Sequence, residues 1–421
     1  MPLKHAVDPA RRITYGIVQC GPNVPDGIPY IRPVDMDKEK GAALGALRRT
    51  APEIAAVYAR STVVESDLVV SIGPSFGKVM IVPAAIAGAN LTQGTARVAP
   101  AKHVDTRFLF WCLRSQPLHQ AWESNCSGAT FRSLTLETLA ECHLAYPPLE
   151  EQRAIADFLD RETSKIDALA AKKERLIELL QEKRTALITH AVTKGLDPNA
   201  PMKPSDIDWL GDIPAHWDVK RLWHLTPDDR SIMYGIVLPG PHFDGGVPIV
   251  KGGDVSPERL HLDRLNRTTP EIEARYVRSR LRGGDIVYAI RGSIGEAELV
   301  PAELTGANLT QDAARIAPDD GVNGSWLLYA VKSEAVYRQL EAGALGATIR
   351  GINIRDLKRA LIPVPPPNEQ QEIAEYLSQR TSALKNLKAR IQEGLDRLKE
   401  YRTGLISAAV TGKIDVREEV A

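Results

Sequence analysis

The chain carries one order of segments twice, and this internal repeat constrains its fold more than any other feature. The motif Ile-Thr-Tyr-Gly-Ile-Val at residues 13–18 returns, with one substitution, at residues 232–237. Further along, Gly-Ala-Asn-Leu-Thr-Gln at residues 88–93 returns unchanged at residues 306–311. Two repeats are too few for a solenoid, so the sequence indicates a duplicated domain.

The first part of each repeat predicts a mixed α/β domain. Apolar runs such as those at residues 67–72 and 285–290 are bounded by Gly and Pro, as is typical of short strands. Helical spacing of apolar residues predicts short helices at 106–123 and 326–341. The expected fold class is therefore α/β in both copies.

The second part of each repeat predicts a long helix. Proline pairs at 147–148 and 365–366 precede it, where proline suits a helix start but not a helix interior. Many of the apolar residues that follow are spaced by three or four, as in the seam of a coiled coil. They are Ile155, Leu159, Ile166, Leu169, Leu176, Leu180 and Leu187 in the first copy, and Ile373, Leu377, Leu384, Leu387, Ile391, Leu398 and Leu405 in the second. About 40 residues at roughly 1.5 Å each give a rod on the order of 60 Å.

Two equal rods with matching seams can bury those seams against each other. An antiparallel pair would place the two α/β domains at opposite ends, related by an approximate twofold axis. Duplex DNA has local dyads of its own, so symmetric domains can meet two half-sites a set distance apart. The helical pair would then act as a ruler between them.

Composition excludes some classes of protein and leaves DNA binding open. The 421 residues suggest two or three domains, and 43% hydrophobic with 25% charged residues is ordinary for a globular protein. No apolar run reaches the roughly 18 to 20 residues that span a bilayer, and the first residues lack a signal-peptide pattern, so we expect a cytoplasmic protein without membrane contact. Lys plus Arg and Asp plus Glu both number 53, so basic groups for a nucleic acid would have to be sorted locally.

The duplication also tests for catalytic chemistry, because residues needed in both copies should recur. The four cysteines, Cys20, Cys112, Cys126 and Cys142, fall opposite Pro239, Ala330, Ala344 and Ala360. We therefore expect free thiols and no shared thiol or metal site. Among the histidines only His5 and His224 align, and a lone pair of this kind is more often structural.

No motif of a known enzyme class stands out. Residues 73–79 faintly resemble a phosphate-binding loop, but the glycines are one residue too close, and the counterpart has Glu296 where the lysine would be. What recurs there is Ser75 with Ser293 and Gly77 with Gly295, which indicates a tight turn. An adenine methyltransferase would need an Asn-Pro-Pro-aromatic segment, which the chain lacks. We therefore expect no catalytic residue.

Taken together, these features resemble the specificity subunits of type I restriction-modification enzymes. The resemblance rests on the Pro-Pro-x-x-Glu-Gln-x-x-Ile-Ala boxes at 147–156 and 365–374 and on the helices ending in Leu-Ile-x-x-Ala-Val-Thr at 187–193 and 405–411. The Trp-rich segment 208–222 is similar to the start of a second target-recognition domain in that family. The first copy departs from the pattern, because the residues before Ile13 are too few for such a segment.

The resemblance implies two α/β target-recognition domains separated by two long helices that form an antiparallel coiled coil with pseudo-twofold symmetry. The domains would be residues 1–146 and 201–364, and the spacer helices 147–200 and 365–421. Each domain would read one half of a bipartite target in double-stranded DNA. The helices would dock two modification subunits, with restriction subunits joining in complexes that cleave. S-adenosylmethionine, ATP and Mg would then be bound by the partners, and this chain would hold no cofactor.

Candidate DNA contacts are polar side chains on turns and loops, because base edges offer donors and acceptors and phosphates attract cations. In the first copy they are Ser75, Lys78, Asn90, Gln93, Thr130 and Arg132, and in the second Arg291, Ser293, Asn308, Gln311, Thr348 and Arg350. The recurring Asn and Gln residues could equally cap turns within the fold.

The similarity of the two copies predicts closely related half-sites on opposite strands. Substitutions such as Gly73 opposite Arg291 argue against identical ones. Two other readings remain open: a specificity subunit of a system whose nuclease and methyltransferase are fused, and a coiled-coil scaffold whose α/β domains bind protein ligands. A scaffold would show no salt-dependent DNA binding.

Overall fold

The computed structural model describes residues 1–36, 44–125, 133–344 and 351–416. The chain forms two compact units. Unit 1 comprises residues 1–174 with the stretch from 392 onward, and unit 2 comprises residues 175–391. Each unit holds one mixed domain and a segment of each long helix.

Unit 1 contains two small sheets. Four antiparallel strands form the first, in the order β1-β7-β4-β5, and three strands form the second, in the order β3-β2-β6. In the second sheet β2 and β6 pair in parallel and β2 and β3 antiparallel. The strands are β1 (Thr14–Tyr15), β2 (Ile28–Ile31), β3 (Arg48–Thr50), β4 (Leu68–Ser71), β5 (Val79–Ile81), β6 (Asn90–Leu91) and β7 (Thr95–Val98).

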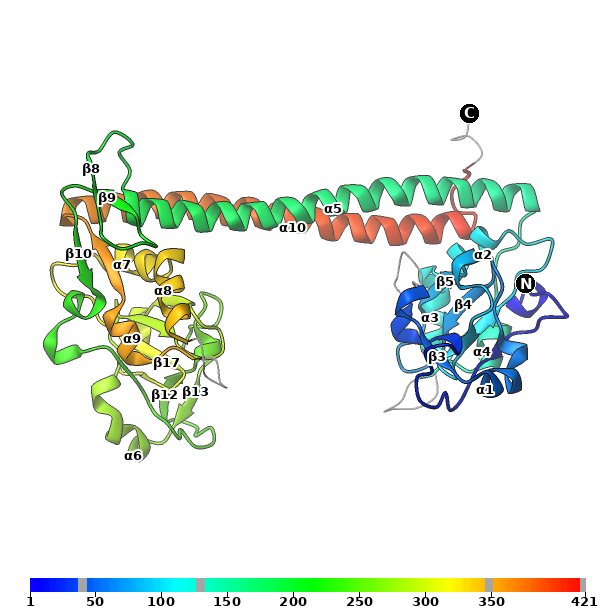
Figure 1. Ribbon diagram of the computed structural model, residues 1–421, viewed down its shortest axis with the longest axis horizontal. Helices are drawn as coiled ribbons and strands as arrows, with labels where there is room; N and C mark the ends of the chain where they lie inside the picture. The colour runs from blue at the N-terminus through cyan, green and yellow to red at the C-terminus, as the bar shows by residue number, and fades with distance from the viewer. Residues whose placement is uncertain (37–43, 126–132, 345–350, 417–421) are drawn as a thin grey trace. The chain divides into compact units, whose positions relative to one another are not determined.

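The helices of unit 1 are α1 (Pro52–Val57), α2 (Thr106–Leu113), α3 (Gln116–Asn125) and α4 (Leu136–Glu141), with 3-10 turns η1 (Leu3–His5), η2 (Pro33–Asp35), η3 (Leu44–Ala46), η4 (Ala59–Ser61) and η5 (Ala84–Ile86). Three of these helices, α2, α3 and α4, share one core with the four-stranded sheet, and α1 lies apart from them (Figure 1). The Asp105 carboxylate caps α2 by accepting hydrogen bonds from the Arg107 and Phe108 amides. Phe108, Leu109 and Trp122 then pack on Leu68 and Val98 of the sheet in one buried core.

Unit 2 repeats this arrangement, with the sheets β11-β17-β14-β15 and β13-β12-β16. Its strands are β11 (Met233–Tyr234), β12 (Val247–Val250), β13 (Asn266–Thr268), β14 (Ile286–Ala289), β15 (Ala297–Leu299), β16 (Asn308–Leu309) and β17 (Ala313–Ile316). Its helices and 3-10 turns are α6 (Pro270–Glu273), α7 (Gly324–Val331), α8 (Glu334–Ala344), α9 (Ile354–Arg359), η6 (Leu222–Leu225), η7 (Asp228–Arg230), η8 (Gly252–Asp254), η9 (Ala274–Ser279) and η10 (Ala302–Leu304).

Both helical regions predicted after the sheets are interrupted. The range 106–123 contains α2 and α3, and the range 326–341 contains α7 and α8. In unit 2 the break lies at Ser333, which is 1% exposed. Its hydroxyl donates to the Ala330 carbonyl at 2.6 Å and accepts from the Val336 amide at 3.4 Å, so it ends one helix and begins the next.

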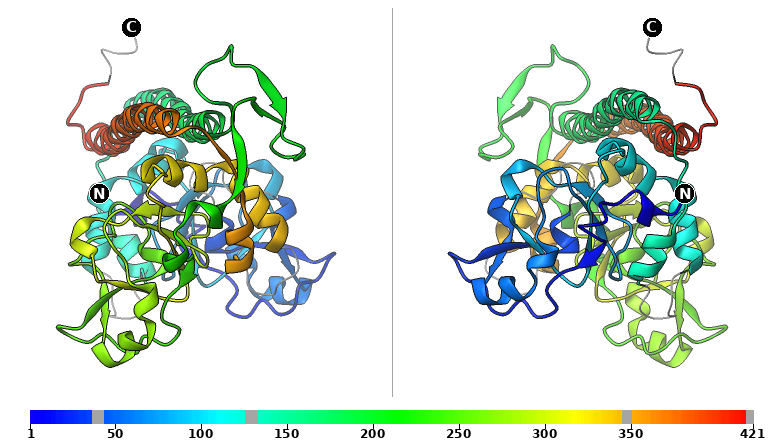
Figure 2. Two further views of the ribbon diagram at one scale, coloured as in Figure 1. Left: turned by 90° about the vertical axis from the view of Figure 1, so that its left-hand side faces the viewer. Right: turned by 90° about the vertical axis from the view of Figure 1, so that its right-hand side faces the viewer.

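Unit 2 has a leading segment that unit 1 lacks in the described residues. It forms the hairpin β8 (Met202–Pro204) with β9 (Asp212–Pro214), and then β10 (Asp218–Arg221), which pairs with β18 (Leu361–Val364). The hairpin lies beside the helix pair (Figure 2). Among the described residues of unit 1, residues 1–3 take this place, through hydrogen bonds such as the Leu3 amide to the Cys142 carbonyl at 2.8 Å.

The two long helices are α5 (Leu149–Lys194) and α10 (Pro367–Val410). In unit 1 the first part of α5 packs against the last part of α10, and Arg402 holds Asp167 with two hydrogen bonds of 2.7 and 3.0 Å. In unit 2 the last part of α5 packs against the first part of α10, where Ile188 and Ile373 share one core. The helices are therefore antiparallel within each unit, as the seams predicted.

The predicted seam is only partly buried. Leu169, Leu176 and Leu387 are 45%, 43% and 44% exposed, so their assignment to helix packing was wrong. Thr163 and Thr381, at matching positions of the repeats, are buried and bond back to the carbonyls four residues earlier, and the Thr381 hydroxyl also lies 3.2 Å from that of Tyr329 on α7. A two-helix contact buries a narrow stripe, and a 3.6-residue helical turn drifts away from a strict seam unless the helices supercoil. Of the helices in the described ranges, none is long and apolar enough to cross a membrane.

Candidate nucleic-acid interface

Two matching hairpin turns carry half of the predicted contacts that can be located. They comprise residues 72–78 between β4 and β5 and residues 290–296 between β14 and β15, and we call them the hairpin turns. Ser75, Arg291 and Ser293 are exposed on them. Hydroxyl and guanidinium groups presented in this way can reach base edges or phosphates.

A glycine and an aromatic ring hold each hairpin turn in place. Gly77 and Gly295 both have φ of +90°, a backbone angle that residues with a side chain rarely adopt. A Cβ on Gly77 would lie 2.5 Å from the His119 ring of α3, and one on Gly295 would lie 2.9 Å from the Tyr337 ring of α8. This geometry confirms the tight turn that the recurring glycine predicted.

Lys78 is anchored within its own domain. Its side chain is half-buried, and its Nζ donates to the Pro33 carbonyl at 3.0 Å. Its counterpart in unit 2 is Glu296. A phosphate contact from Lys78 would have to compete with this hydrogen bond, whereas Arg291, with its nearest carboxylate 4.0 Å away on Asp312, is far less restrained.

A neighbouring loop brings the predicted glutamines beside the hairpin turns. The Ile72 amide donates to the Gly94 carbonyl at 2.8 Å, and the Ile290 amide to the Asp312 carbonyl at 2.9 Å, which ties each turn to the loop before β7 or β17. Gln93, on the first of these loops, is exposed. Gln311, on the second, is half-buried.

The segment after β1 and β11 joins the same surface, and residue-type reasoning missed it. The Gln93 amide donates to the Ile17 carbonyl at 2.9 Å, and unit 2 has the same bond. Tyr15 and Val18 are 36% and 46% exposed there, and their counterparts Tyr234 and Val237 are 47% and 39% exposed. The recurrence of the Tyr-Gly-Ile-Val motif was a usable signal, because two exposed apolar side chains that recur in both copies are not explained by a core.

The glycine of that motif permits a close backbone approach. A Cβ on Gly16 would lie 2.0 Å from the Leu91 carbonyl oxygen, and a Cβ on Gly235 would lie 2.0 Å from that of Leu309. Any side chain would push the segment away from β6 or β16. The recurring glycine therefore sets the position at which the exposed tyrosine is presented.

Two of the predicted contacts are wrong. Asn90 and Asn308 are 1% and 0% exposed, so neither can touch a base or a phosphate. The Asn90 amide nitrogen donates to the Ala55 and Tyr58 carbonyls, both at 3.2 Å. Asn308 donates to the Tyr276 carbonyl at 3.0 Å. The asparagines recur because they satisfy buried backbone groups, a need that both copies share.

In each unit a partly buried arginine forms an ion pair with a buried carboxylate close to this surface. Arg11 donates two hydrogen bonds to the Asp67 carboxylate, at 2.7 and 2.6 Å. Arg230 and Asp285 repeat the arrangement at 2.9 and 2.7 Å. Both carboxylates are 2% exposed, and each also accepts a backbone amide three residues earlier. The pair links the segment before the Tyr-Gly-Ile-Val motif to the start of β4 or β14.

A second arginine is buried beside each pair. Arg97 and Arg315 are 6% and 3% exposed, and burial lowers the pKa of both side chains, helped by the neighbouring arginine of the ion pair. Arg97 donates to the Thr62 carbonyl at 2.9 Å, and Arg315 to the Ser231 carbonyl at 3.0 Å. These cations are structural and are not available to a ligand.

Four further predicted contacts, Thr130, Arg132, Thr348 and Arg350, lie outside the described residues. So does Cys126. The other three cysteines are free. Within the described ranges, no cluster of three His, Cys, Asp or Glu side chains could hold a metal ion.

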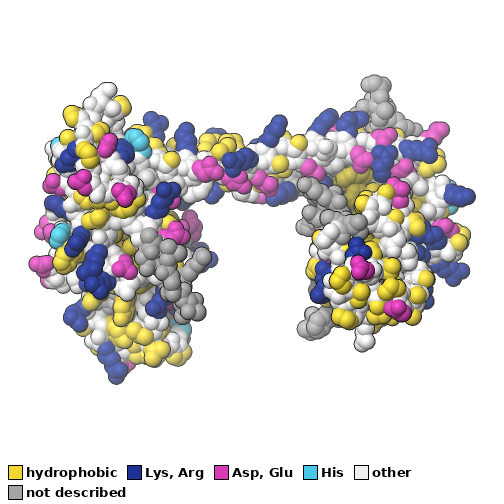
Figure 3. Space-filling view, in the orientation of Figure 1, with side chains coloured by type: hydrophobic (Ala, Val, Ile, Leu, Met, Phe, Trp, Pro, Cys, Tyr) yellow, Lys and Arg dark blue, Asp and Glu magenta, His cyan; other side chains and the backbone are white. Residues whose placement is uncertain are grey.

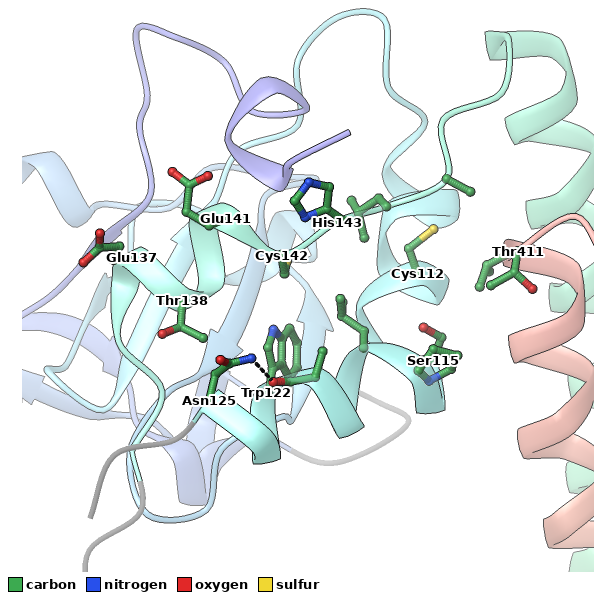
Figure 4. Close-up of a pocket in the computed structure, with 16 residues that line it drawn as sticks. Cys112, Ser115, Trp122, Asn125, Glu137, Thr138, Glu141, Cys142, His143 and Thr411 are labelled. Atoms are coloured by element: carbon green, nitrogen blue, oxygen red, sulfur yellow. Dashed lines mark hydrogen bonds between the residues drawn. The ribbon is translucent and has the colours of Figure 1, made fainter.

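Unit 1 also contains a cavity of about 520 Å³ lined by residues of α2, α3 and α4, by residues 142–145 and by the end of α10 with Thr411 (Figure 4). Cys112, Trp122 and Cys142 form part of its wall. Burial raises the pKa of the Cys142 thiol to about 12 and raises that of Cys112 as well. Both thiols therefore stay protonated near neutral pH and are poor nucleophiles. This cavity contains no member of the hairpin turns.

The amino-acid sequence matches a family model described as the type I restriction modification DNA specificity domain, over residues 22–179 and 241–396. Among curated relatives, the EcoBI specificity subunit of Escherichia coli is 27% identical over 299 residues, which are 70% of this chain and 63% of that protein. The MjaVIII specificity subunit of Methanocaldococcus jannaschii is 25% identical over 322 residues, 75% of this chain and 72% of that protein.

Solved structures show the same fold. A chain from a study of complex assembly and conformational transition in the type I R-M system superposes with a TM-score of 0.73 at 18% identity, covering 97% of this chain and 96% of that one. The HsdS subunit from Thermoanaerobacter tengcongensis gives a TM-score of 0.54 at 18% identity, covering 98% and 96%. The arrangement of two mixed domains and long helices is thus that of these subunits.

Proposed function

The chain belongs to the type I restriction-modification DNA specificity family, and on that premise we propose that it reads a bipartite DNA target for a type I complex. Each unit would read one half-site through its hairpin turn, the loop before β7 or β17, and the Tyr-Gly-Ile-Val motif. The chain itself would be non-catalytic. Methyl transfer with S-adenosylmethionine, and ATP- and Mg-dependent cleavage where it occurs, would belong to partner subunits.

One observation carries this proposal: the two units present matching exposed surfaces, and matching buried contacts lie behind them. Both units present a hairpin turn held by glycine against an aromatic ring, and both present a tyrosine set by a close glycine. A single ligand site would need only one such surface. Two equivalent surfaces in one chain suit a ligand with two related halves, as duplex DNA provides.

We infer that the half-sites are related but not identical. The two hairpin turns share their serine and glycine, yet Gly73 stands opposite Arg291 and Lys78 opposite Glu296. Because residues 73–78 and 291–296 have equal length and each turn is held by a glycine against an aromatic ring, we expect that the second turn can replace the first. We expect the hybrid chain to specify a target whose halves are more alike than those of the parent.

The long helices offer a surface for partners. Leu169 on the unit 1 part of α5, and Leu176 and Leu179 on its unit 2 part, are 43–45% exposed, and Leu387 on α10 is 44% exposed. Apolar side chains that neither core nor seam uses are suited to burial against another subunit. We propose that modification subunits dock there.

The test compares adenine methylation in cells that express the chain with its candidate modification subunits and in cells that lack only this chain. We expect a bipartite methylated motif that depends on the chain and whose halves and spacing are both read out. If the complex assembles but no chain-dependent motif appears, the protein is a scaffold and not a specificity subunit. If a motif appears only with a fused nuclease-methyltransferase, the chain serves that class of system.

A further inference from the structure

Unit 2 contains a basic hollow whose lining includes no residue of the hairpin turn. It has a volume of about 480 Å³ and lies between the end of β10, η6 and α9. Four cations line it, Arg221, Arg355, Lys358 and Arg359, together with Trp223. Lys and Arg side chains gather over α9 on this face of unit 2 (Figure 3).

The four cations have no ion-pair partner among the residues that the structure describes. None of them forms an ion pair with any residue in the described ranges, although 22 such contacts join other residues there. Clustered like charges repel, and no ion pair among the described residues offsets this repulsion. In a chain with equal numbers of acidic and basic residues, an unpaired cluster of this size points to an anionic ligand.

Trp223 adds a flat apolar surface to the hollow. Its side chain is 50% exposed, and its ring stacks on His224 with centroids 4.9 Å apart and planes 25° apart. The ring is therefore held at the surface without belonging to a core. An aromatic face beside guanidinium groups is a combination that nucleic-acid-binding proteins use for sugars and bases next to phosphates.

Unit 1 shows that the fold does not require this cluster. Its α4 occupies the place of α9, and Glu137, Ala140 and Glu141 stand where unit 2 has Arg355, Lys358 and Arg359. Glu141 pairs with Lys4, the counterpart of Trp223, at 2.7 Å. The same helix is thus acidic in one copy and basic in the other, which separates the cluster from any shared structural need.

The hollow adjoins the hairpin turn of unit 2. A Cβ on Gly351 would lie 3.3 Å from Cγ of Arg291, and the Ile352 amide donates to the Ile290 carbonyl at 2.8 Å. The next residue, Asn353, lines the hollow and caps α9. Three consecutive residues therefore join the surface proposed to read bases to the basic cluster.

We propose that this hollow binds backbone phosphates of the DNA duplex beside the second half-site, independently of base sequence. The proposal rests on the proposed function, because it assigns the contact to the same bound duplex. Guanidinium forks match phosphate oxygens, and Trp223 would pack against the adjoining sugar. The second recognition domain would then hold DNA more tightly and with a steeper salt dependence than the first.

The test measures binding of the assembled complex to labelled duplexes, with and without the methylated motif, across a range of salt concentrations. The variant is Arg355→Glu with Arg359→Glu, which installs the residues that α4 already carries, so the helix tolerates them. A milder variant is Arg355→Ala with Arg359→Ala. The control is Arg275→Ala with Arg278→Ala, which removes two exposed arginines of η9 in the same unit.

We expect the alanine variant to weaken binding to both duplexes by the same factor and to reduce the slope of log affinity against log salt by about 1.8, or roughly 0.9 for each lost phosphate contact. The methylated motif should stay the same. An unchanged slope, or an equal loss in the control, overturns the proposal and leaves the specificity role standing. Loss of subunit assembly with unchanged DNA binding would also overturn it, in favour of an acidic protein partner. Failure of the unaltered complex to bind DNA would instead count against the proposed function.

Discussion

The two units differ far more at their surfaces than in their buried polar contacts. Inside, both keep an arginine–aspartate pair, a second buried arginine and an asparagine that bonds backbone carbonyls. Outside, the helix before the long spacer carries glutamates in one unit and arginines in the other. Buried polar groups depend on one another, so losing one leaves its partners unsatisfied, whereas an exposed side chain can change alone.

The units also differ in what contacts the chain close to the start of each long helix. In unit 2, Trp217 is fully buried, and its indole nitrogen donates to the Glu369 carboxylate at 3.0 Å, which fastens the leading segment to the start of α10. In unit 1, the terminal amine of Met1 donates to the Leu144 carbonyl at 2.7 Å and the chain reaches the sheet edge directly. The same domain edge is therefore held in two different ways.

The largest expected effect tests whether the arginine–aspartate pairs stabilise the two units equally. Asp67→Ala and Asp285→Ala should each lower the free energy of unfolding of their own unit by about 3–5 kcal/mol, because each leaves a partly buried arginine without its carboxylate. Denaturant unfolding followed by circular dichroism measures this. The exposed acids Asp26→Ala and Asp263→Ala serve as controls. A large loss in only one unit would show that the two ion pairs contribute differently to the free energy of unfolding.

The second prediction sharpens the comparison at the hairpin turns. Arg291→Ala should weaken discrimination at one position of the second half-site by about 1–3 kcal/mol and leave the first half-site unchanged. Binding to a panel of single-base variants of the target measures it. Arg264→Ala, which removes an exposed arginine elsewhere in unit 2, is the control. Equal weakening on every duplex would assign Arg291 to a phosphate and not to a base.

The third prediction concerns a polar atom that only unit 2 buries. The Tyr288 hydroxyl has no hydrogen-bond partner among the described residues, burial raises its pKa, and Val70 occupies the matching position in unit 1. Tyr288→Phe should therefore stabilise unit 2 by up to about 1 kcal/mol. Thermal unfolding measures the change, with the exposed Tyr401→Phe as control. A clear loss of stability would mean that the hydroxyl is satisfied in solution.

The smallest effect is a difference in pH dependence. Burial, assisted by Arg114, lowers the pKa of His119 below its usual 6.5, and Glu123 opposes this only in part. The unfolded chain therefore takes up this proton at a higher pH than the folded chain. The contribution of neutral His119 to stability is fully present above about pH 6.5 and is lost as the pH falls through the depressed pKa. His119→Tyr, which copies Tyr337 of unit 2, should remove that part of the acid sensitivity.

Unfolding of both variants between pH 5 and about pH 8 measures the difference, because histidine is the side chain that titrates there. The exposed His190→Tyr is the control. An unchanged acid slope after His119→Tyr would show that another group in unit 1 takes up the proton.

Local pattern was enough to predict the elements whose cause is local. The repeat, the positions of α5 and α10, the strands at 67–72 and 285–290 and the glycine of each hairpin turn all follow from short stretches of chain, since helix spacing, strand alternation and turn residues act over a few neighbours. For the same reason the break at Ser333 was missed, because it depends on one buried hydroxyl and not on the apolar pattern.

By itself, the sequence determined that this protein is a duplicated pair of mixed domains with long helical spacers, and its motifs pointed to the right family. Only the tertiary structure decided which polar residues face solvent, because burial depends on contacts between distant segments. Asn90 is removed from the surface by η4, some thirty residues before it. The basic hollow exists only because β10 pairs with β18, which follows α9. This pairing brings Arg221 close to Arg359, although the two are far apart in the chain.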